Sequence, residues 1–189
     1  MGGGVIPRSE TVKFLGLILD SNLSWNDHIN SVIRKILSIT RAFWRTSAYI
    51  PHNLKRQIYF ALVHTHLTYL CSVWGHCGGT ALGRLLRIQN RALKILYGLP
   101  ILTSTTELYK MCKVPKITEQ ISYSSAILMA KIIRGEILSN VNIKRASELH
   151  KYSTRKIFLI KKSTPKTTKF GLCNVLYSCL LYTSPSPRD

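Results

Sequence analysis

Acidic side chains are scarce in this sequence of 189 residues. Only 8 Asp and Glu stand against 27 Lys and Arg, which gives a formal net charge of +19. Residues 28–106 contain no acid at all, although ten Lys or Arg lie among them. Ion pairs within a helix therefore cannot balance these cations. A polyanionic partner can, and nucleic acid is the first candidate.

Long apolar runs and targeting signals are missing as well. No apolar run approaches the roughly 18 to 20 residues that span a bilayer, and the first ten residues, MGGGVIPRSE, lack the apolar core of a signal peptide. The five cysteines are odd in number and irregularly spaced, which is typical of reduced thiols. We therefore expect an intracellular protein, nuclear or cytoplasmic, with no membrane partner. Binding of basic helices to an anionic membrane remains the alternative.

No group of residues has the spacing of a metal or nucleophile site. Five side chains invite a zinc hypothesis: His64, His66, Cys71, His76 and Cys77. Structural zinc sites favour Cys pairs and His pairs at short fixed spacings, which this stretch does not have. No Cys–His set has a third orienting group either. We therefore predict no catalytic residue, no metal ligand and no cofactor in this chain.

What the sequence does contain is helical periodicity. We expect one strand or a short hairpin within 12–20, and then a helix capped by Asn26 or Asp27. Further helices are predicted after Pro51 to about residue 74, over 80–97 with Gly98 as its stop, from Ser104 to about 112, and over 118–134. The predicted fold class is therefore mainly α, with a strand or hairpin at the N-terminus, a multi-helix bundle and a basic irregular C-terminal arm.

Two of the predicted helices carry a basic stripe opposite their apolar face. At about 100° per residue, each set falls within a narrow arc of its helix. The candidate nucleic-acid-binding residues are Arg34, Arg41 and Arg45 in the first set, and Arg84, Arg87, Arg91 and Lys94 in the second. The alternative is an ordinary solvated surface. Trp25, Trp44 and Trp74 could stack on bases, but core packing is the preferred interpretation, with Trp44 on the apolar face of its helix.

Several stretches, in order, resemble one family, the reverse transcriptases of non-LTR retrotransposons (LINE or jockey-like). VKFLGLILDSNLSWNDHI (12–29) resembles the segment after the catalytic core of those enzymes, and IYFALVHTHLTYLCSVWG (58–75) resembles their next helix. RLLRIQNRALKILYGLP (84–100) is similar to the following basic helix, and residues 153–178 are similar to the C-terminal stretch. The resemblance covers about residues 10–178.

The resemblance implies a piece of an RNA-directed DNA polymerase. According to this resemblance, the chain would contain the end of a palm-like region (1–25), a helical thumb-like domain (26–140) and a truncated basic C-terminal region (141–178). The implied partners are the backbone of an RNA or DNA duplex and the remainder of the reverse transcriptase polypeptide. Mg²⁺ is expected only for the parent polymerase, because its metal-binding aspartate pair has no counterpart here. Asp20 and Asp27 are expected to have structural roles.

Two other interpretations accompany this one. The chain could be a stand-alone basic helical nucleic-acid-binding protein with no polymerase parent. The last eleven residues, CLLYTSPSPRD (179–189), resemble translated sequencing adapter, and we expect them to be an artefactual tail.

Overall fold

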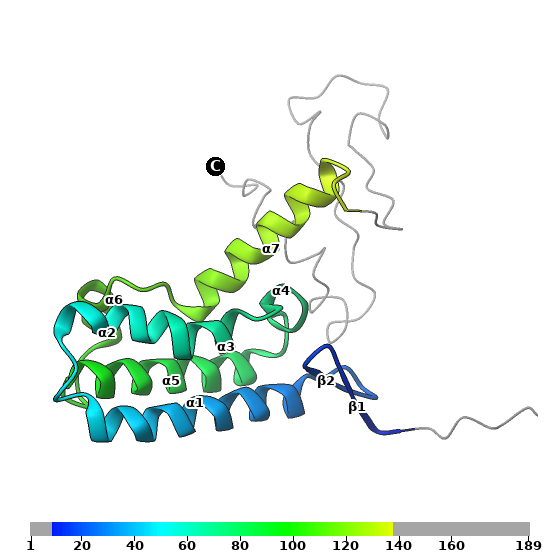
Figure 1. Ribbon diagram of the computed structural model, residues 1–189. Helices are drawn as coiled ribbons and strands as arrows, with labels where there is room; N and C mark the ends of the chain where they lie inside the picture. Colours follow the sequence, from blue (N-terminus) through cyan, green and yellow to red (C-terminus); the bar gives the residue numbers. More distant parts are fainter. Residues whose placement is uncertain (1–8, 138–189) are drawn as a thin grey trace, which may run out of the picture. The chain divides into compact units, whose positions relative to one another are not determined.

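The computed structural model describes residues 9–137, and these form a mainly helical fold behind an N-terminal hairpin (Figure 1). The predicted fold class is confirmed for this part of the chain. The basic region 141–178 and the tail 179–189 lie outside the described residues. The described chain divides into two compact units. One contains residues up to Tyr69 together with Cys77–Ile117, and the other contains Leu70–His76 and the chain from Thr118 onward.

The predicted strand within 12–20 is a two-stranded antiparallel hairpin. Strand β1 (Thr11–Phe14) pairs with β2 (Leu17–Asp20), with Phe14 opposite Leu17. The turn consists of Leu15 (φ 46°) and Gly16 (φ 82°), so both central residues have the positive φ that a tight two-residue hairpin turn requires. An apolar run without Asn-Gly or Asp-Gly gives little sign of such a turn in the sequence.

Asp20 organises the loop that leads into the first long helix, α1 (Asn26–Thr46). Its two carboxylate oxygens accept hydrogen bonds from the backbone N–H groups of Ser24 (2.9 Å) and Trp25 (3.0 Å). Burial would raise the pKa of Asp20, but these hydrogen bonds outweigh burial and hold the pKa below its ordinary value of 3.8.

The predicted cap of α1 at Asn26 or Asp27 is therefore wrong. The residue before the helix is Trp25, in the left-handed region (φ 62°), and its side chain makes no capping hydrogen bond. Asp20 satisfies the backbone of this entry loop from six residues upstream of the helix.

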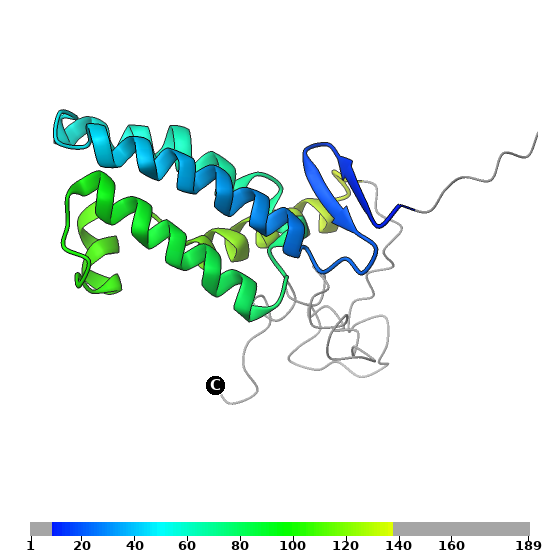
Figure 2. The same cartoon turned by 90° about the horizontal axis from the view of Figure 1, so that it is seen from below.

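Helix α1 packs along α5 (Gly79–Tyr97), and the two run in the same direction (Figure 2). The interior between the helices of this unit is mostly apolar, with the following fully or almost fully buried members: Ile29, Val32, Ile36 and Phe43 from α1, and Leu85, Ala92, Leu93 and Leu96 from α5. Gly98 (φ 68°) ends α5, and its N–H bonds to the carbonyl of Ile95, as the sequence predicts for a C-terminal stop.

The helix predicted from Pro51 to about residue 74 is interrupted. It consists of α2 (His52–Tyr59), a π-helical turn η1 (Phe60–His64) and α3 (Thr65–Thr68), which follow one another as a single rod in Figure 1. The rod ends before Tyr69, whose hydroxyl donates to the carbonyl of Leu15 (2.8 Å) in the hairpin turn. Leu70 then takes a left-handed conformation (φ 50°), so the helix cannot continue.

A buried polar cluster joins three parts of the first unit. Gln89 on α5 is 1% exposed, and its Nε2 donates to the hydroxyl of Tyr59 (2.7 Å) and to the carbonyl of Pro115 (2.9 Å). Its Oε1 accepts from the backbone N–H of Ile117 (2.9 Å). The polar atoms of the Gln89 amide are thus used to hold α2, α5 and the 115–117 segment together.

Helix α6 (Thr105–Cys112) begins as predicted, because the Ser104 hydroxyl accepts from the N–H of Glu107 (3.2 Å). In the second unit, α4 (Cys71–Trp74) precedes Gly75, and α7 runs over Ile117–Ile133, close to the predicted helix over 118–134. A Cβ on Gly75 would lie 2.6 Å from the side chain of Ile121, so glycine allows a close approach there. His76 Nε2 and Ser125 Oγ lie 2.9 Å apart in the same unit.

Candidate nucleic-acid interface

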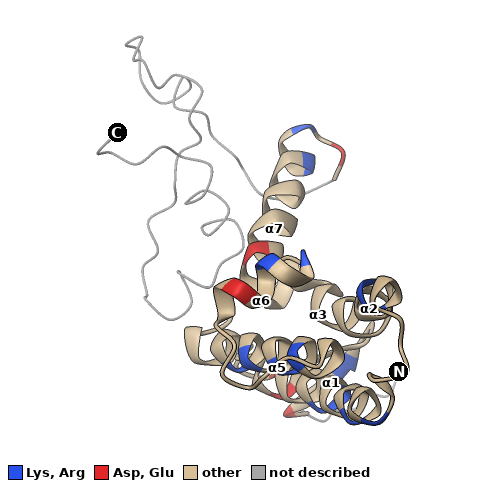
Figure 3. Cartoon of the chain, turned by 90° about the vertical axis from the view of Figure 1, so that its left-hand side faces the viewer, with Lys and Arg blue, Asp and Glu red and all other residues tan. Residues whose placement is uncertain are grey.

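The seven predicted binding residues lie on the two helices that pack side by side. Five of them are exposed: Arg34, Arg41, Arg45, Arg87 and Arg91. Arg84 and Lys94 are only partly exposed. Blue segments recur along both α1 and α5 in Figure 3, so the cations form two rows on neighbouring helices.

Arg84 links the two rows. Its guanidinium crosses from α5 to α1, where Nη1 donates to Asn30 Oδ1 (2.8 Å) and Nη2 donates to Asn26 Oδ1 (3.2 Å). Both acceptors are neutral amides, so the positive charge stays uncompensated while the side chain is held in place. Arg84 therefore has a part in helix pairing, which the periodicity of the sequence did not indicate.

The hydrogen bond between Arg84 and Asn30 also shows on which side of α1 its arginines lie. Asn30 faces Arg84, and helical geometry puts Arg41 about 20° from Asn30 around α1, with Arg34 about 40° and Arg45 about 60° away. The buried residue Ile36 lies about 120° away, on the opposite side of Asn30. The two rows therefore flank the outer side of one helix pair, and we call this surface the α1–α5 face.

The cations of this face bond only to neutral groups among residues 9–137. Arg34 Nε donates to the Asn30 carbonyl (3.4 Å), and Arg87 Nε donates to the Gly83 carbonyl (3.2 Å). Lys94 Nζ donates to the carbonyl of Ile101 (2.5 Å), which ties the loop after α5 to the helix. None of the seven cations forms an ion pair with a carboxylate in the described part of the chain. The α1–α5 face therefore keeps its positive charge.

A pocket of about 760 Å³ opens at one end of the α1–α5 face. Its lining comes from the end of α1, the second half of α5 and the loop after α5, and consists of Trp44, Ser47, Arg87, Asn90, Arg91, Lys94, Ile95, Gly98, Leu99 and Ile101. We call it the Trp44 pocket. It combines an aromatic ring, aliphatic side chains and three of the seven predicted cations.

Trp44 itself is where the sequence interpretation fails. The helical pattern predicted that Trp44 packs in the core with Phe43, but Trp44 is 75% exposed and Phe43 is 2% exposed. Trp44 is only about 40° from Asn30 around α1, which places it at the border between the apolar side and the arginines. Trp74, by contrast, is fully buried, and Trp25 is partly buried beside His28.

The histidines and cysteines that were considered for zinc and set aside do not form a cluster. Within residues 9–137, no three His, Cys, Asp or Glu side chains come together in a way that could hold a metal ion. Cys71, Cys77 and Cys112 are buried and form no disulfide with one another, and burial raises the pKa of Cys112 to about 11. Burial has the opposite effect on a histidine, because it again disfavours the charged form, and it lowers the pKa of His64. The Nε2 of His64 is buried without a hydrogen-bond partner among the described residues. Also within this part of the chain, no helix has the length and apolar character to cross a bilayer.

Comparison with known proteins agrees with the resemblance seen in the sequence. The chain is 30% identical over 124 residues to the RNA-directed DNA polymerase from mobile element jockey of Drosophila funebris. It is 23% identical over 124 residues to the probable RNA-directed DNA polymerase from transposon X-element of Drosophila melanogaster. The corresponding polymerase of transposon BS, from the same fly, is 24% identical over 123 residues.

The chain is similar to part of non-LTR retrotransposon RNA-directed DNA polymerases. Each match takes in 64% of this chain but only 14% of the relative's length, so the similarity concerns one region of a much longer enzyme. No protein-family profile matches the chain, and no solved structure matches it.

Proposed function

We propose that this chain is the duplex-binding region of a non-LTR retrotransposon reverse transcriptase. In this proposal, residues 26–140 are the thumb-like part of an RNA-directed DNA polymerase, and residues 1–25 are the end of its palm. The α1–α5 face contacts the phosphates of the primer–template duplex and so holds the primer end in position. The observation that carries the proposal is the doubled row of cations with no carboxylate to pair with in the described chain.

Phosphate contact fits the chemistry of this face better than base reading does. Phosphate contacts position a protein on a duplex without carrying sequence information, and a polymerase must hold every sequence that it copies. Arg41, Arg45 and Arg91 are exposed and make no hydrogen bond within residues 9–137, so their guanidinium groups are available for phosphate oxygens.

Catalysis belongs to another part of the parent enzyme in this proposal. Asp20 is engaged with the backbone of Ser24 and Trp25, and the sequence contains no adjacent Asp-Asp pair to hold the two Mg²⁺ ions of phosphoryl transfer. We infer that the remainder of the polymerase supplies the metal centre and that this chain supplies binding.

The test is a triple change of Arg41, Arg87 and Arg91 to Gln in the full chain. These side chains come from both helices, and Arg84 is left intact because it bridges to α1. Each phosphate contact adds about 0.9 to the slope of log affinity against log salt on B-form DNA. The variant should therefore bind DNA duplexes of any sequence more weakly, with a slope flatter by roughly two to three units.

The matched control removes the same charge elsewhere, by changing Lys13, Lys110 and Lys131 to Gln, all of which are exposed. This control should retain most of the affinity and the slope. Fluorescence anisotropy with labelled DNA duplexes and RNA–DNA hybrids measures both quantities. Equal losses in the two triple variants would show that net charge alone, and not the α1–α5 face, is responsible for binding.

A further inference from the structure

Trp44 is a large aromatic side chain that the fold leaves uncovered. It is 75% exposed at the end of a helix whose neighbouring Phe43 is buried. Its indole makes no ring contact and no hydrogen bond with other described residues. Single exposed apolar side chains are common on protein surfaces, but Trp44 lines a pocket beside cations, where another molecule can cover its ring.

The surroundings of Trp44 define the chemistry of that molecule. The Trp44 pocket holds Arg87 and Arg91 on one wall, and no described carboxylate pairs with either of them. A volume of about 760 Å³ falls in the range of roughly 300–1,000 Å³ that is typical of sites for compact ligands. A flat π surface beside guanidinium groups suits a flat, uncharged ring that is attached to an anion.

An unpaired nucleotide has this composition. Aromatic side chains stack on bases of any kind, and cations alongside them follow the phosphate backbone. We propose that the Trp44 pocket holds an unpaired nucleotide of a single-stranded segment, with its base against the indole and its phosphates toward Arg87 and Arg91. This inference rests on the proposed function, because it places a single strand beside the duplex bound to the α1–α5 face.

Asn90 adds a polar group to the wall of the pocket. Its Oδ1 accepts a hydrogen bond from the hydroxyl of Tyr109 on α6 (2.7 Å), which holds the side chain in place. Among the described residues its amide nitrogen has no acceptor, so it can donate to the edge of a stacked base. Every base has acceptor atoms on its edge, and this contact would therefore favour a base without selecting one.

An acidic amphipathic peptide is the competing occupant, because it also combines apolar and anionic groups. A helix bound in a groove needs apolar anchors at i, i+3, i+4 and i+7, and thus an apolar stripe to receive them. Here the part of the pocket formed by α5 is lined by the cations Lys94, Arg91 and Arg87, at the positions where such an apolar stripe would have to lie. The arrangement favours a chain of phosphates.

The test compares Trp44→Ala and Trp44→Phe in the full chain. The probes are a short oligothymidylate, an abasic oligonucleotide of the same length and charge, and a blunt DNA duplex. Loss of a base–aromatic stack of about 1–3 kcal/mol corresponds to a roughly 5- to 150-fold weaker binding of the oligothymidylate by Trp44→Ala. Trp44→Phe keeps a ring and should retain most of the affinity. The abasic probe should bind the unaltered chain weakly and respond little to either change.

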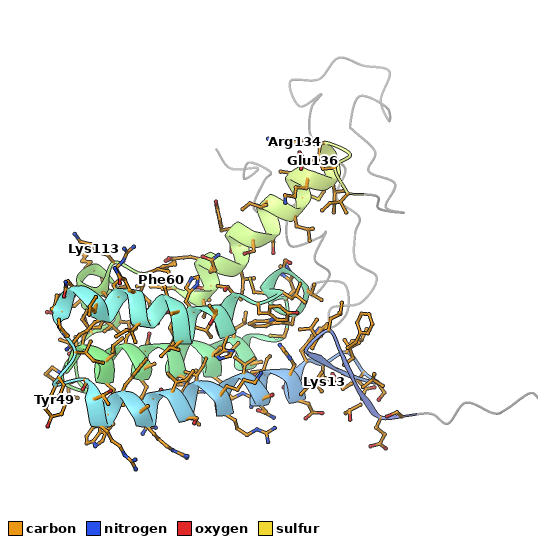
Figure 4. The ribbon with its side chains drawn as sticks, viewed as in Figure 1. Lys13, Tyr49, Phe60, Lys113, Arg134 and Glu136 are labelled. Carbon is orange, nitrogen blue, oxygen red and sulfur yellow. The ribbon has the colours of Figure 1, made fainter. Side chains whose placement is uncertain are left out.

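Tyr49→Ala is the control for loss of an exposed aromatic ring. Tyr49 is 87% exposed just beyond the end of α1 and does not line the pocket, and Figure 4 shows it at that end of the helix. Its loss should leave binding of all three probes unchanged. Because both side chains are exposed, neither alanine variant should lose thermal stability, and circular dichroism melting checks this.

The outcomes separate this inference from the proposed function. If Trp44→Ala binds oligothymidylate as tightly as the unaltered chain, or if the abasic probe binds equally well, the nucleotide site is wrong even when the arginine variant has lost its affinity for duplexes. The opposite result is that changing Arg41, Arg87 and Arg91 leaves the affinity for duplexes unchanged, while Trp44→Ala lowers the affinity for oligothymidylate. The duplex-binding face would then be wrong, and the single-strand site would be supported. An acidic peptide whose binding is weakened by Trp44→Ala, when binding of oligothymidylate is not, would overturn the inference in favour of a protein partner.

Discussion

The two sides of helix α5 use polar residues in opposite ways. The outer side carries Arg84, Arg87, Arg91 and Lys94, whose charges meet no carboxylate in the described chain. The inner side carries Gln89, which is 1% exposed and bonds to Tyr59, Pro115 and Ile117. Polar groups in the interior must form hydrogen bonds within the protein itself, whereas surface cations are solvated and stay accessible to a ligand. Stability and binding should therefore be separable on this one helix.

The largest effect should come from the inner side. Changing Gln89 to Leu leaves the Tyr59 hydroxyl and the Ile117 N–H buried without their partner, and it also removes the donor to the partly buried Pro115 carbonyl. Each buried group left unpaired costs about 1–3 kcal/mol. We expect a loss of about 3 kcal/mol or more in the free energy of unfolding, measured by urea denaturation. Gln57→Leu on the exposed side of α2 is the control and should change stability by less than about 0.5 kcal/mol. Similar losses in the two variants would refute the structural role of the Gln89 cluster.

The next effect is a change of stability with pH. Acidic pH should lower the free energy of unfolding through the histidines of the interior, and it should leave the cations on the outer side of α5 unchanged. Burial lowers the pKa of His28, His64, His66 and His76 below the ordinary value of 6.5, and Lys35 lowers those of His28 and His66 further. The unfolded chain then binds more protons than the folded chain as the pH drops through 6.5. Stability should therefore be complete above that pH and should fall as the solution becomes more acidic.

His28 shows why protonation is unfavourable, because its Nδ1 accepts from the N–H of Ile18 (3.4 Å) and a proton there would abolish that bond. Arginines stay charged over the whole range, so the α1–α5 face keeps its charge. Urea denaturation at about pH 8 and about pH 5.5 measures the difference. His64→Leu should reduce the loss at acid pH, since it removes one of the four groups. A stability that does not change between the two pH values would contradict the assignment of these histidines as neutral in the fold.

The smallest effect distinguishes two arginines on the same side of α5. Arg84 bonds to Asn26 and Asn30, so Arg84→Gln should cost about 1 kcal/mol of stability. Arg91 makes no hydrogen bond with another described residue, and Arg91→Gln should change stability by less than about 0.5 kcal/mol. Denaturation of the two variants side by side gives the comparison. If Arg91→Gln is the more destabilising, the outer side of α5 contributes to folding in a way that the contacts of Arg84 do not explain.

Much of the local structure could be predicted because local physical chemistry determines it. Ser104 accepts the N–H of Glu107 at the start of α6, and Gly98 ends α5 in a left-handed conformation, as their residue types predict. The cations of α1 and α5 could be identified in the same way, since periodicity and the lack of acids are properties of the sequence.

Other features arise from contacts between residues far apart in the chain. Tyr69 bonds to Leu15 and the rod from α2 ends there, although residues 51–74 have the pattern of one continuous helix. That contact cannot be seen from local spacing, because it depends on where the hairpin lies. A local contact was missed as well: the carboxylate of Asp20, and not Asn26 or Asp27, satisfies the loop that enters α1, through the N–H groups four and five residues further along the chain.

The sequence by itself determined the helical class, the positive charge and the two rows of cations, because composition and the 3.6-residue period act over a few turns of one helix. Only the tertiary structure decided how the two rows lie relative to each other and which neighbouring side chains stay exposed. The parallel packing of α1 along α5 places both rows on one face, fixes Arg84 between them and leaves Trp44 exposed beside Arg91. Helical periodicity assigns a residue to a side of its own helix, but whether that side is covered depends on the neighbouring helix.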